Sequence, residues 1–176
     1  SNMFSYGENN IINLDTSRIT QLTAPNGSGK SSIAMIIQEI LFNKNVKGIK
    51  KTDILNRWVK GKSWNAALTF MCDSSDCEVI VTRSGAQTKV KFIKDRVDES
   101  EHKVLDTYKK ISQVVGTDFE VFSQLTYQSS TDLLDFLKAT DTNRKKFLIN
   151  LFNLEKYITI GDKIKTKTSA TEKDNI

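Results

Sequence analysis

The sequence predicts an α/β fold, and three observations lead to that prediction. A glycine-rich stretch at residues 24–32 separates an apolar run from a run with helical spacing. Residues 66–93 alternate between apolar and polar side chains, which is typical of an antiparallel meander. Residues 99–115 return to helical spacing, as do several stretches after residue 131. With 176 residues, of which 38% are hydrophobic, the chain is long enough to bury a core.

The glycine-rich stretch, Ala-Pro-Asn-Gly-Ser-Gly-Lys-Ser-Ser, fits a phosphate-binding loop. From Gly29 onward it matches the pattern G-x-x-x-x-G-K-[ST], and its one departure is Ala24 in place of the first glycine. Alanine fits that position if its φ is negative. The apolar run at residues 18–23 predicts a buried strand before the loop, and residues 32–42 predict a helix after it. This context disfavours the alternative, a glycine-rich turn that merely contains a lysine.

We therefore expect the loop to bind ATP with Mg²⁺. Glycines let backbone N–H groups turn toward phosphate oxygens, and the helix N-terminus adds its positive dipole end. Lys30 would reach the outer phosphates, and the Ser31 hydroxyl would complete the Mg²⁺ shell. The predicted nucleotide-binding residues of the loop are Asn26, Gly27, Ser28, Gly29, Lys30, Ser31 and Ser32.

Composition narrows the class of protein without defining it. The formal net charge is +5, which is compatible with a polyanionic partner, although each single lysine cluster is interpreted as a solvated surface. No stretch is apolar enough to span a bilayer and no secretory signal opens the chain, so we expect a soluble, intracellular protein. Cys72 and Cys77 flank a polar turn and are expected to be reduced. Together with His102, expected to face solvent, they cannot supply a zinc site.

Periodicity gives the remaining elements. The predicted elements are strands at 11–14, 20–23, 66–71, 78–83 and 88–93, and helices at 32–43, 99–115, 131–139, 143–152 and 155–168. Ser84-Gly85 is expected to be a hairpin turn, and Gly116 to end a helix. The last helix carries few apolar residues beyond Tyr157, Ile158 and Ile164. We therefore expect it to leave the globular body as the root of a coiled coil.

Taken in order, these motifs resemble those of one family. The motifs are residues 2–7 (a first-strand motif), residues 25–32 (the phosphate loop), Gln128 before residues 132–137 (a Q-loop) and residues 144–157 (the passage into a coiled coil). The chain is similar in these respects to the N-terminal ATPase lobe of SMC-like repair ATPases. These comprise the bacterial SbcC type, its eukaryotic and archaeal counterparts, and the large subunits of phage recombination endonucleases. Phe4 departs from the pattern, because some members carry a phosphate-binding Arg there.

The resemblance implies an ABC-type P-loop ATPase N-lobe with a mixed sheet, an antiparallel β-meander and the start of a coiled-coil helix. The lobe would span residues 1–154, and the root of the coil residues 155–176. It also implies that Ser5 and the 61–64 loop, with Lys62 and Ser63, touch the nucleotide. Gln128 would be a catalytic residue that contacts Mg²⁺ or the attacking water. The alternative for Gln128 is a polar residue at the end of a strand.

The implied partners are a C-terminal ATPase lobe of the same protein, a second copy in a head dimer, an SbcD-type nuclease subunit and DNA, with no membrane. ATP-dependent head dimerisation would gate access to DNA. The implied location is the cytoplasm of a bacterial or phage-infected cell, or its nucleoid. A nucleotide-gated SMC or RecF-like clamp without a nuclease is the alternative. A small P-loop kinase or GTPase is disfavoured, because no Asn-Lys-x-Asp or Asp-x-x-Gly motif is present.

Two elements that ABC-type ATPases need for hydrolysis are not found in this sequence. One is four apolar residues followed by Asp-Glu, and the nearest string, at residues 132–135, has the wrong pattern. The other is Leu-Ser-Gly-Gly, and the nearest string is the predicted hairpin turn at residues 84–87. The chain therefore looks like one lobe of an ATPase, which is expected to load nucleotide without hydrolysing it at a useful rate.

Overall fold

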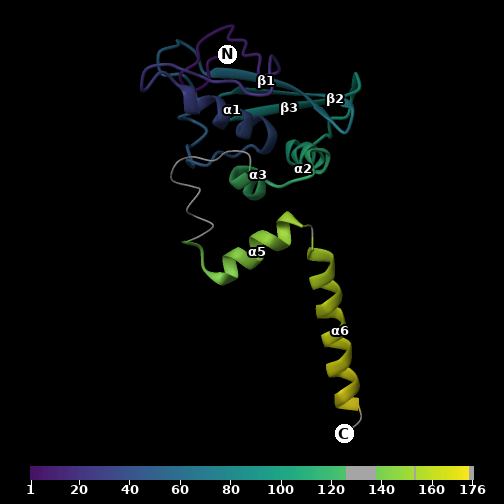
Figure 1. The fold of residues 1–176 in the computed structure, drawn as a ribbon. Helices are drawn as coiled ribbons and strands as arrows, with labels where there is room; N and C mark the ends of the chain where they lie inside the picture. Colours follow the sequence, from purple (N-terminus) through teal and green to yellow (C-terminus); the bar gives the residue numbers. More distant parts are fainter. Residues whose placement is uncertain (126–137, 153, 175–176) are drawn as a thin grey trace. The chain divides into compact units, whose positions relative to one another are not determined.

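The structure is a computed structural model that describes residues 1–125, 138–152 and 154–174 (Figure 1). The chain divides into two compact units, residues 1–119 and residues 120–176, and each is described by itself. The division at 119/120 separates two groups of residues, each of which packs mainly against itself. The predicted boundary at 154/155 separates a lobe from a coiled-coil helix, and it stays a prediction.

The first unit is built on a four-stranded antiparallel sheet. Its strands are β1 (Ser63–Cys72), β2 (Ser75–Ser84), β3 (Gln87–Lys94) and β4 (Val97–Asp98), in the order β1-β2-β3-β4. The three predicted strands of the meander are confirmed, and each is longer than the sequence pattern indicated. Ser84 pairs with Gln87 across a turn in which Gly85 has a φ of 57°. Residues 84–87 are therefore a hairpin turn, as predicted.

Two helices cover one face of this sheet. Figure 1 shows α1 (Lys30–Phe42) and α2 (Val104–Val115) on the same side of the strands, and both contact the sheet and each other. The core that they enclose contains Met35, Ile40, Val79, Val81, Phe92 and Ile111, all buried. The predicted alternation of β1 is confirmed, because Leu68 and Phe70 are half-buried whereas Thr69 and Met71 are exposed.

Each of these two helices ends at a residue in the left-handed backbone conformation. Asn43 has a φ of 54° and donates its backbone N–H to the Glu39 carbonyl oxygen at 3.0 Å. Gly116 has a φ of 74° and donates to the Ser112 carbonyl oxygen at 3.0 Å, which confirms the predicted stop. His102, just before α2, is exposed as predicted.

The segment between residues 8 and 28 differs from the prediction. The expected strands at 11–14 and 20–23 do not form, and every residue of the segment is exposed. Ile11 keeps 94% and Ile19 keeps 87% of its surface in solvent. A strand needs a neighbour for its backbone N–H and C=O groups, and the described sheet offers none to this segment. The described sheet is antiparallel throughout, so the mixed sheet stays a prediction.

The second unit is helical in its described residues. Helix α3 (Phe119–Leu125) begins at the end of the first unit, and α5 (Asp141–Leu151) and α6 (Glu155–Asp174) follow. The predicted helices at 143–152 and from 155 onward are confirmed, and α6 runs beyond the expected end near residue 168. The helix expected at 131–139 lies mostly outside the described residues. Among the described helices, none combines the length and apolar content that a membrane crossing requires.

Candidate phosphate-binding site

The glycine-rich loop leads directly into α1. Gly27 and Gly29 have φ values of 83° and 96°, which L-residues rarely adopt, and the helix begins at Lys30. No side chain caps this helix N-terminus within the described chain. Since the first turn of a helix leaves backbone N–H groups without intrahelical partners, the loop presents free donors to an anion. Ala24 does not have a positive φ, so it meets the condition under which alanine fits the first position.

A tight turn formed by residues 2–7 lies over Gly29. Its ends are joined by hydrogen bonds from Asn2 N to Gly7 O at 2.8 Å and between Met3 and Tyr6. The Tyr6 hydroxyl donates to the Gly29 carbonyl oxygen at 3.2 Å. Burial raises the pKa of Tyr6, so this hydroxyl stays a donor at neutral pH. The turn therefore brings Ser5 to the glycine-rich loop, whereas the contact of Ser5 with a nucleotide stays a prediction.

Gly29 is required here for two independent reasons. Its φ is strained for any L-residue, and a Cβ built on it would lie 2.8 Å from Ser5 Cβ. Gly27 is strained in the same sense, but nothing lies within 4 Å of its added Cβ. Sequence reasoning missed Tyr6. The one sequence feature that could have pointed to Tyr6 is that an aromatic residue stands inside the first-strand motif.

Lys30 lies across the mouth of the loop. Its ammonium donates to the Pro25 carbonyl oxygen at 2.9 Å and to that of Ala24. Both acceptors are neutral carbonyls, and a charged acceptor such as a phosphate oxygen would bind this cation more strongly. The Ser31 side chain is exposed and could enter a Mg²⁺ shell. Ser32 is only 8% exposed, and its backbone N–H donates to the Gly29 carbonyl oxygen at 2.9 Å. Its side chain and its N–H therefore both face the protein.

The other predicted site residues are not gathered at the loop. Ser63 lines a separate cavity of about 230 Å³ with Asn2 and Trp64, and the Lys62 carbonyl oxygen accepts from Gly85 N at 3.0 Å. Within the described chain, no hydrogen bond or ion pair joins Lys62 or Ser63 to the phosphate loop. Gln128 lies outside the described residues. No cluster of three His, Cys, Asp or Glu side chains that could hold a metal occurs in the described part of the chain.

An apolar cavity lies between α1 and β1. It measures about 150 Å³ and is lined on one side by Ile33, Ile36 and Ile37 of α1. Ile12 and Leu14 of the exposed segment line another side, although both remain about 40% exposed. The described residues thus leave an apolar surface between α1 and the exposed segment 8–28 incompletely covered.

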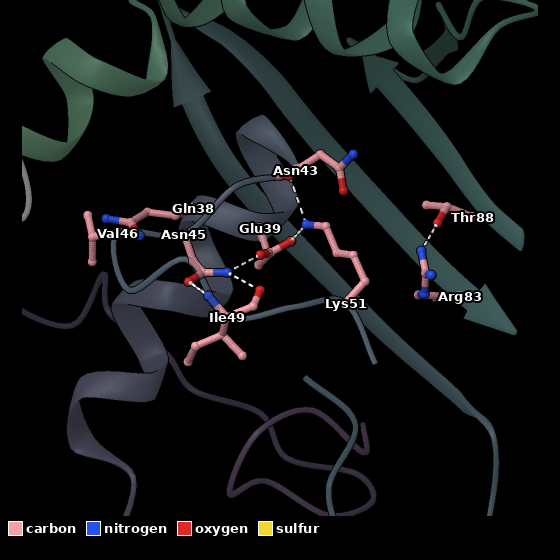
Figure 2. Close-up of polar contacts among 9 residues, drawn as sticks. All are labelled: Gln38, Glu39, Asn43, Asn45, Val46, Ile49, Lys51, Arg83 and Thr88. Carbon is pink, nitrogen blue, oxygen red and sulfur yellow. Dashed lines mark hydrogen bonds and ion pairs between the residues drawn. The ribbon is translucent and has the colours of Figure 1, made fainter. Parts of the chain in front are cut away.

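A buried polar network fixes the far end of α1 (Figure 2). Glu39, 1% exposed, accepts hydrogen bonds from Asn45 Nδ2 at 2.6 Å and from the Lys51 ammonium. Lys51 also donates to the Asn43 carbonyl oxygen at 2.7 Å, and Gln38 Oε1 accepts from Val46 N at 3.0 Å. Lys51 is therefore a structural cation and not part of a solvated face. The Glu39 charge adds to burial in raising the pKa of Tyr108.

Comparison with known proteins gives two viral relatives, and no protein-family model matches the chain. A protein of Escherichia phage T5 named "Probable exonuclease subunit 2" is 43% identical over 166 residues, which cover 94% of this chain and 27% of that protein. An uncharacterized protein of Acanthamoeba polyphaga mimivirus is 28% identical over an alignment 177 residues long, which covers 88% of this chain and 12% of that protein. The chain thus spans only a minor part of the length of each relative.

Proposed function

We propose that this chain is the ATP-binding lobe of an SMC-like DNA-repair or recombination ATPase that acts with a nuclease subunit on DNA ends. The observation that carries the proposal is the phosphate loop, with Gly29 packed against Ser5 at the uncapped start of α1. The name of the phage relative supports the nuclease-associated part, because a numbered exonuclease subunit implies a complex. The same name favours this function over a DNA clamp that has no nuclease partner.

In this proposal, different groups of the loop bind different parts of MgATP. Backbone N–H groups of residues 26–30 surround the phosphates, while the Lys30 ammonium moves from the loop carbonyls to the outer phosphate oxygens. The exposed Ser31 hydroxyl enters the Mg²⁺ shell, and Gln128 binds Mg²⁺ or orients water. Ser5 lies against the loop and is positioned to contact a phosphate, whereas Lys62 and Ser63 would reach the nucleotide only from the start of β1.

The exposed segment supports a C-terminal lobe as the partner that completes this site. Ile11, Ile19 and Leu22 are exposed apolar residues in a stretch whose sequence favours strands. A lobe that supplied neighbouring strands would pair the segment and cover the cavity beside α1. Two such completed heads would then dimerise with ATP and gate DNA. The exposed apolar residues of α6, among them Tyr157 and Ile164, would meet a second helix or the nuclease.

Isothermal titration calorimetry with MgATP tests whether the glycine-rich loop binds ATP. Lys30→Ala should weaken binding about tenfold or more, since a hydrogen bond to a charged group contributes about 1.5–3 kcal/mol. Lys89→Ala is the matched control, because Lys89 is an exposed lysine on β3. Equal affinity for the wild type and Lys30→Ala would contradict the assignment of the loop.

A further inference from the structure

The positive charge of the chain is concentrated in one segment. Residues 44–62 contain seven of the 26 basic residues and one of the 21 acidic residues. The rest of the chain therefore holds 19 basic and 20 acidic residues and is nearly neutral. Six of the seven cations are exposed, and the seventh, Lys51, is paired with Glu39. The net charge of +5 is thus a local property of this segment.

Among the described residues, the most exposed aromatic side chain lies in the same segment. Trp58 keeps 93% of its surface in solvent, whereas Trp64, six residues later, keeps 4%. Arg57, Lys60 and Lys62 flank Trp58 in the chain, and all three are exposed. Trp58 buries almost none of its ring and so adds little to the stability of the fold. Its exposure among cations calls for a ligand with both a flat apolar face and negative charge.

The loop that carries Trp58 is fixed at both ends. On the N-terminal side, the Glu39 network holds residues 43–51, and Ile54 is fully buried. Asn56, 5% exposed, donates its N–H to the Asn2 carbonyl oxygen at 3.0 Å, and its side-chain oxygen accepts from Trp58 N at 2.9 Å. On the C-terminal side, the Lys62 carbonyl oxygen is held by the β2–β3 turn. Trp58 is therefore presented from a fixed base.

We propose that residues 57–62, here called the Trp58 loop, bind single-stranded nucleic acid. A base stacks on the Trp58 ring while Arg57, Lys60 and Lys62 contact the neighbouring phosphates. Aromatic rings interleaved with cations are the combination that single-strand binders use, because every base has a π-face and every nucleotide a charge. In a duplex the base faces are already stacked, so the loop discriminates against double strands. The inference rests on the proposed function only in taking a polynucleotide as the substrate class.

Fluorescence titration of the whole chain with an oligo-dT of about 16 nucleotides tests this inference. The measurement is made without ATP or Mg²⁺, so its outcome is separate from that of the nucleotide titration. Binding should quench tryptophan emission, and Trp58→Phe should abolish the quench because the remaining Trp64 is buried. Trp58→Ala should weaken binding, followed by anisotropy of a labelled oligonucleotide, about tenfold. Leu105→Ala, which truncates another exposed apolar side chain, is the matched control and should leave affinity unchanged.

Salt dependence measures the contribution of the cations. The slope of log affinity against log salt should fall in magnitude by about 1.4 in the Lys60→Ala, Lys62→Ala double variant, since each single-strand phosphate contact contributes about 0.7. Equal affinity of Trp58→Ala and the wild type would overturn the inference, as would a complete lack of oligonucleotide binding. Equal competition by duplex DNA would also overturn it. Loss of binding to a protein partner in Trp58→Ala, with oligonucleotide affinity intact, would reassign the loop to protein docking.

Discussion

Two regions of the first unit carry strand patterns, and only one of them forms strands. In the meander, residues 63–94, Val79 and Phe92 are fully buried. In the segment 8–28, Ile11 and Ile19 are almost fully exposed. The meander finds each pairing partner in the next strand along the chain, across a turn of two residues. The earlier segment pairs with no strand among the described residues, so the same kind of pattern has a different outcome.

The largest effect is expected when the proposed C-terminal lobe is added to the chain. The chain alone should not release phosphate from ATP over multiple turnovers, since no water-orienting acid or signature loop is found in its sequence. Adding the C-terminal ATPase lobe proposed as its partner should raise turnover about a hundredfold or more, because pre-organised groups around the γ-phosphate contribute that much. Phosphate release with Lys30→Ala in the same mixture is the control. Multiple turnovers by the chain alone that vanish in Lys30→Ala would show that the chain itself supplies the catalytic acid and needs no second lobe for hydrolysis.

A smaller effect separates the two glycines of the phosphate loop. Gly29→Ala should lower the free energy of unfolding by about 2–4 kcal/mol, because backbone strain and the clash with Ser5 act together. Gly27→Ala, which has a similar φ and open space around it, should cost only about 1–2 kcal/mol. Urea unfolding of both variants measures the difference. Ser5→Gly in the Gly29→Ala background should recover part of the lost stability. If it recovers none, the turn at residues 2–7 does not contact the loop in solution.

Sequence reasoning recovered what depends on neighbours in the chain. The meander, the turn at Ser84-Gly85, helix α1 and the stop at Gly116 were all predicted, because each is decided within a few residues. Long-range contacts were not predicted. Tyr6 reaches Gly29 over 23 positions, and Lys51 reaches Glu39 over 12. A lysine that pairs with a buried carboxylate cannot be distinguished by pattern from its solvated neighbours, such as Lys47 and Lys50.

The Lys51 contact gives the next prediction. Lys51→Met should lower the free energy of unfolding by about 2–3 kcal/mol, because it leaves the buried Glu39 carboxylate without its cation. The loss is smaller than for a fully buried pair, since Lys51 is 27% exposed. Lys50→Met, at an exposed neighbour, should stay within about 0.5 kcal/mol. Equal urea midpoints for the two variants would contradict the pairing, and Glu39→Gln added to Lys51→Met should restore part of the loss.

The smallest effect returns to the exposed segment. Ile19→Ala should change the free energy of unfolding of the chain by no more than about 0.5 kcal/mol, because the Ile19 side chain buries almost no surface. Val79→Ala, a truncation inside the meander, should cost about 2–3 kcal/mol. In the assembly with the C-terminal lobe, Ile19→Ala should instead weaken association about tenfold or more, since Ile19 would then be buried. If Ile19→Ala destabilises the isolated chain as much as Val79→Ala does, segment 8–28 is packed without a partner. The difference between the two regions would then lie in their local sequence and not in a missing neighbour.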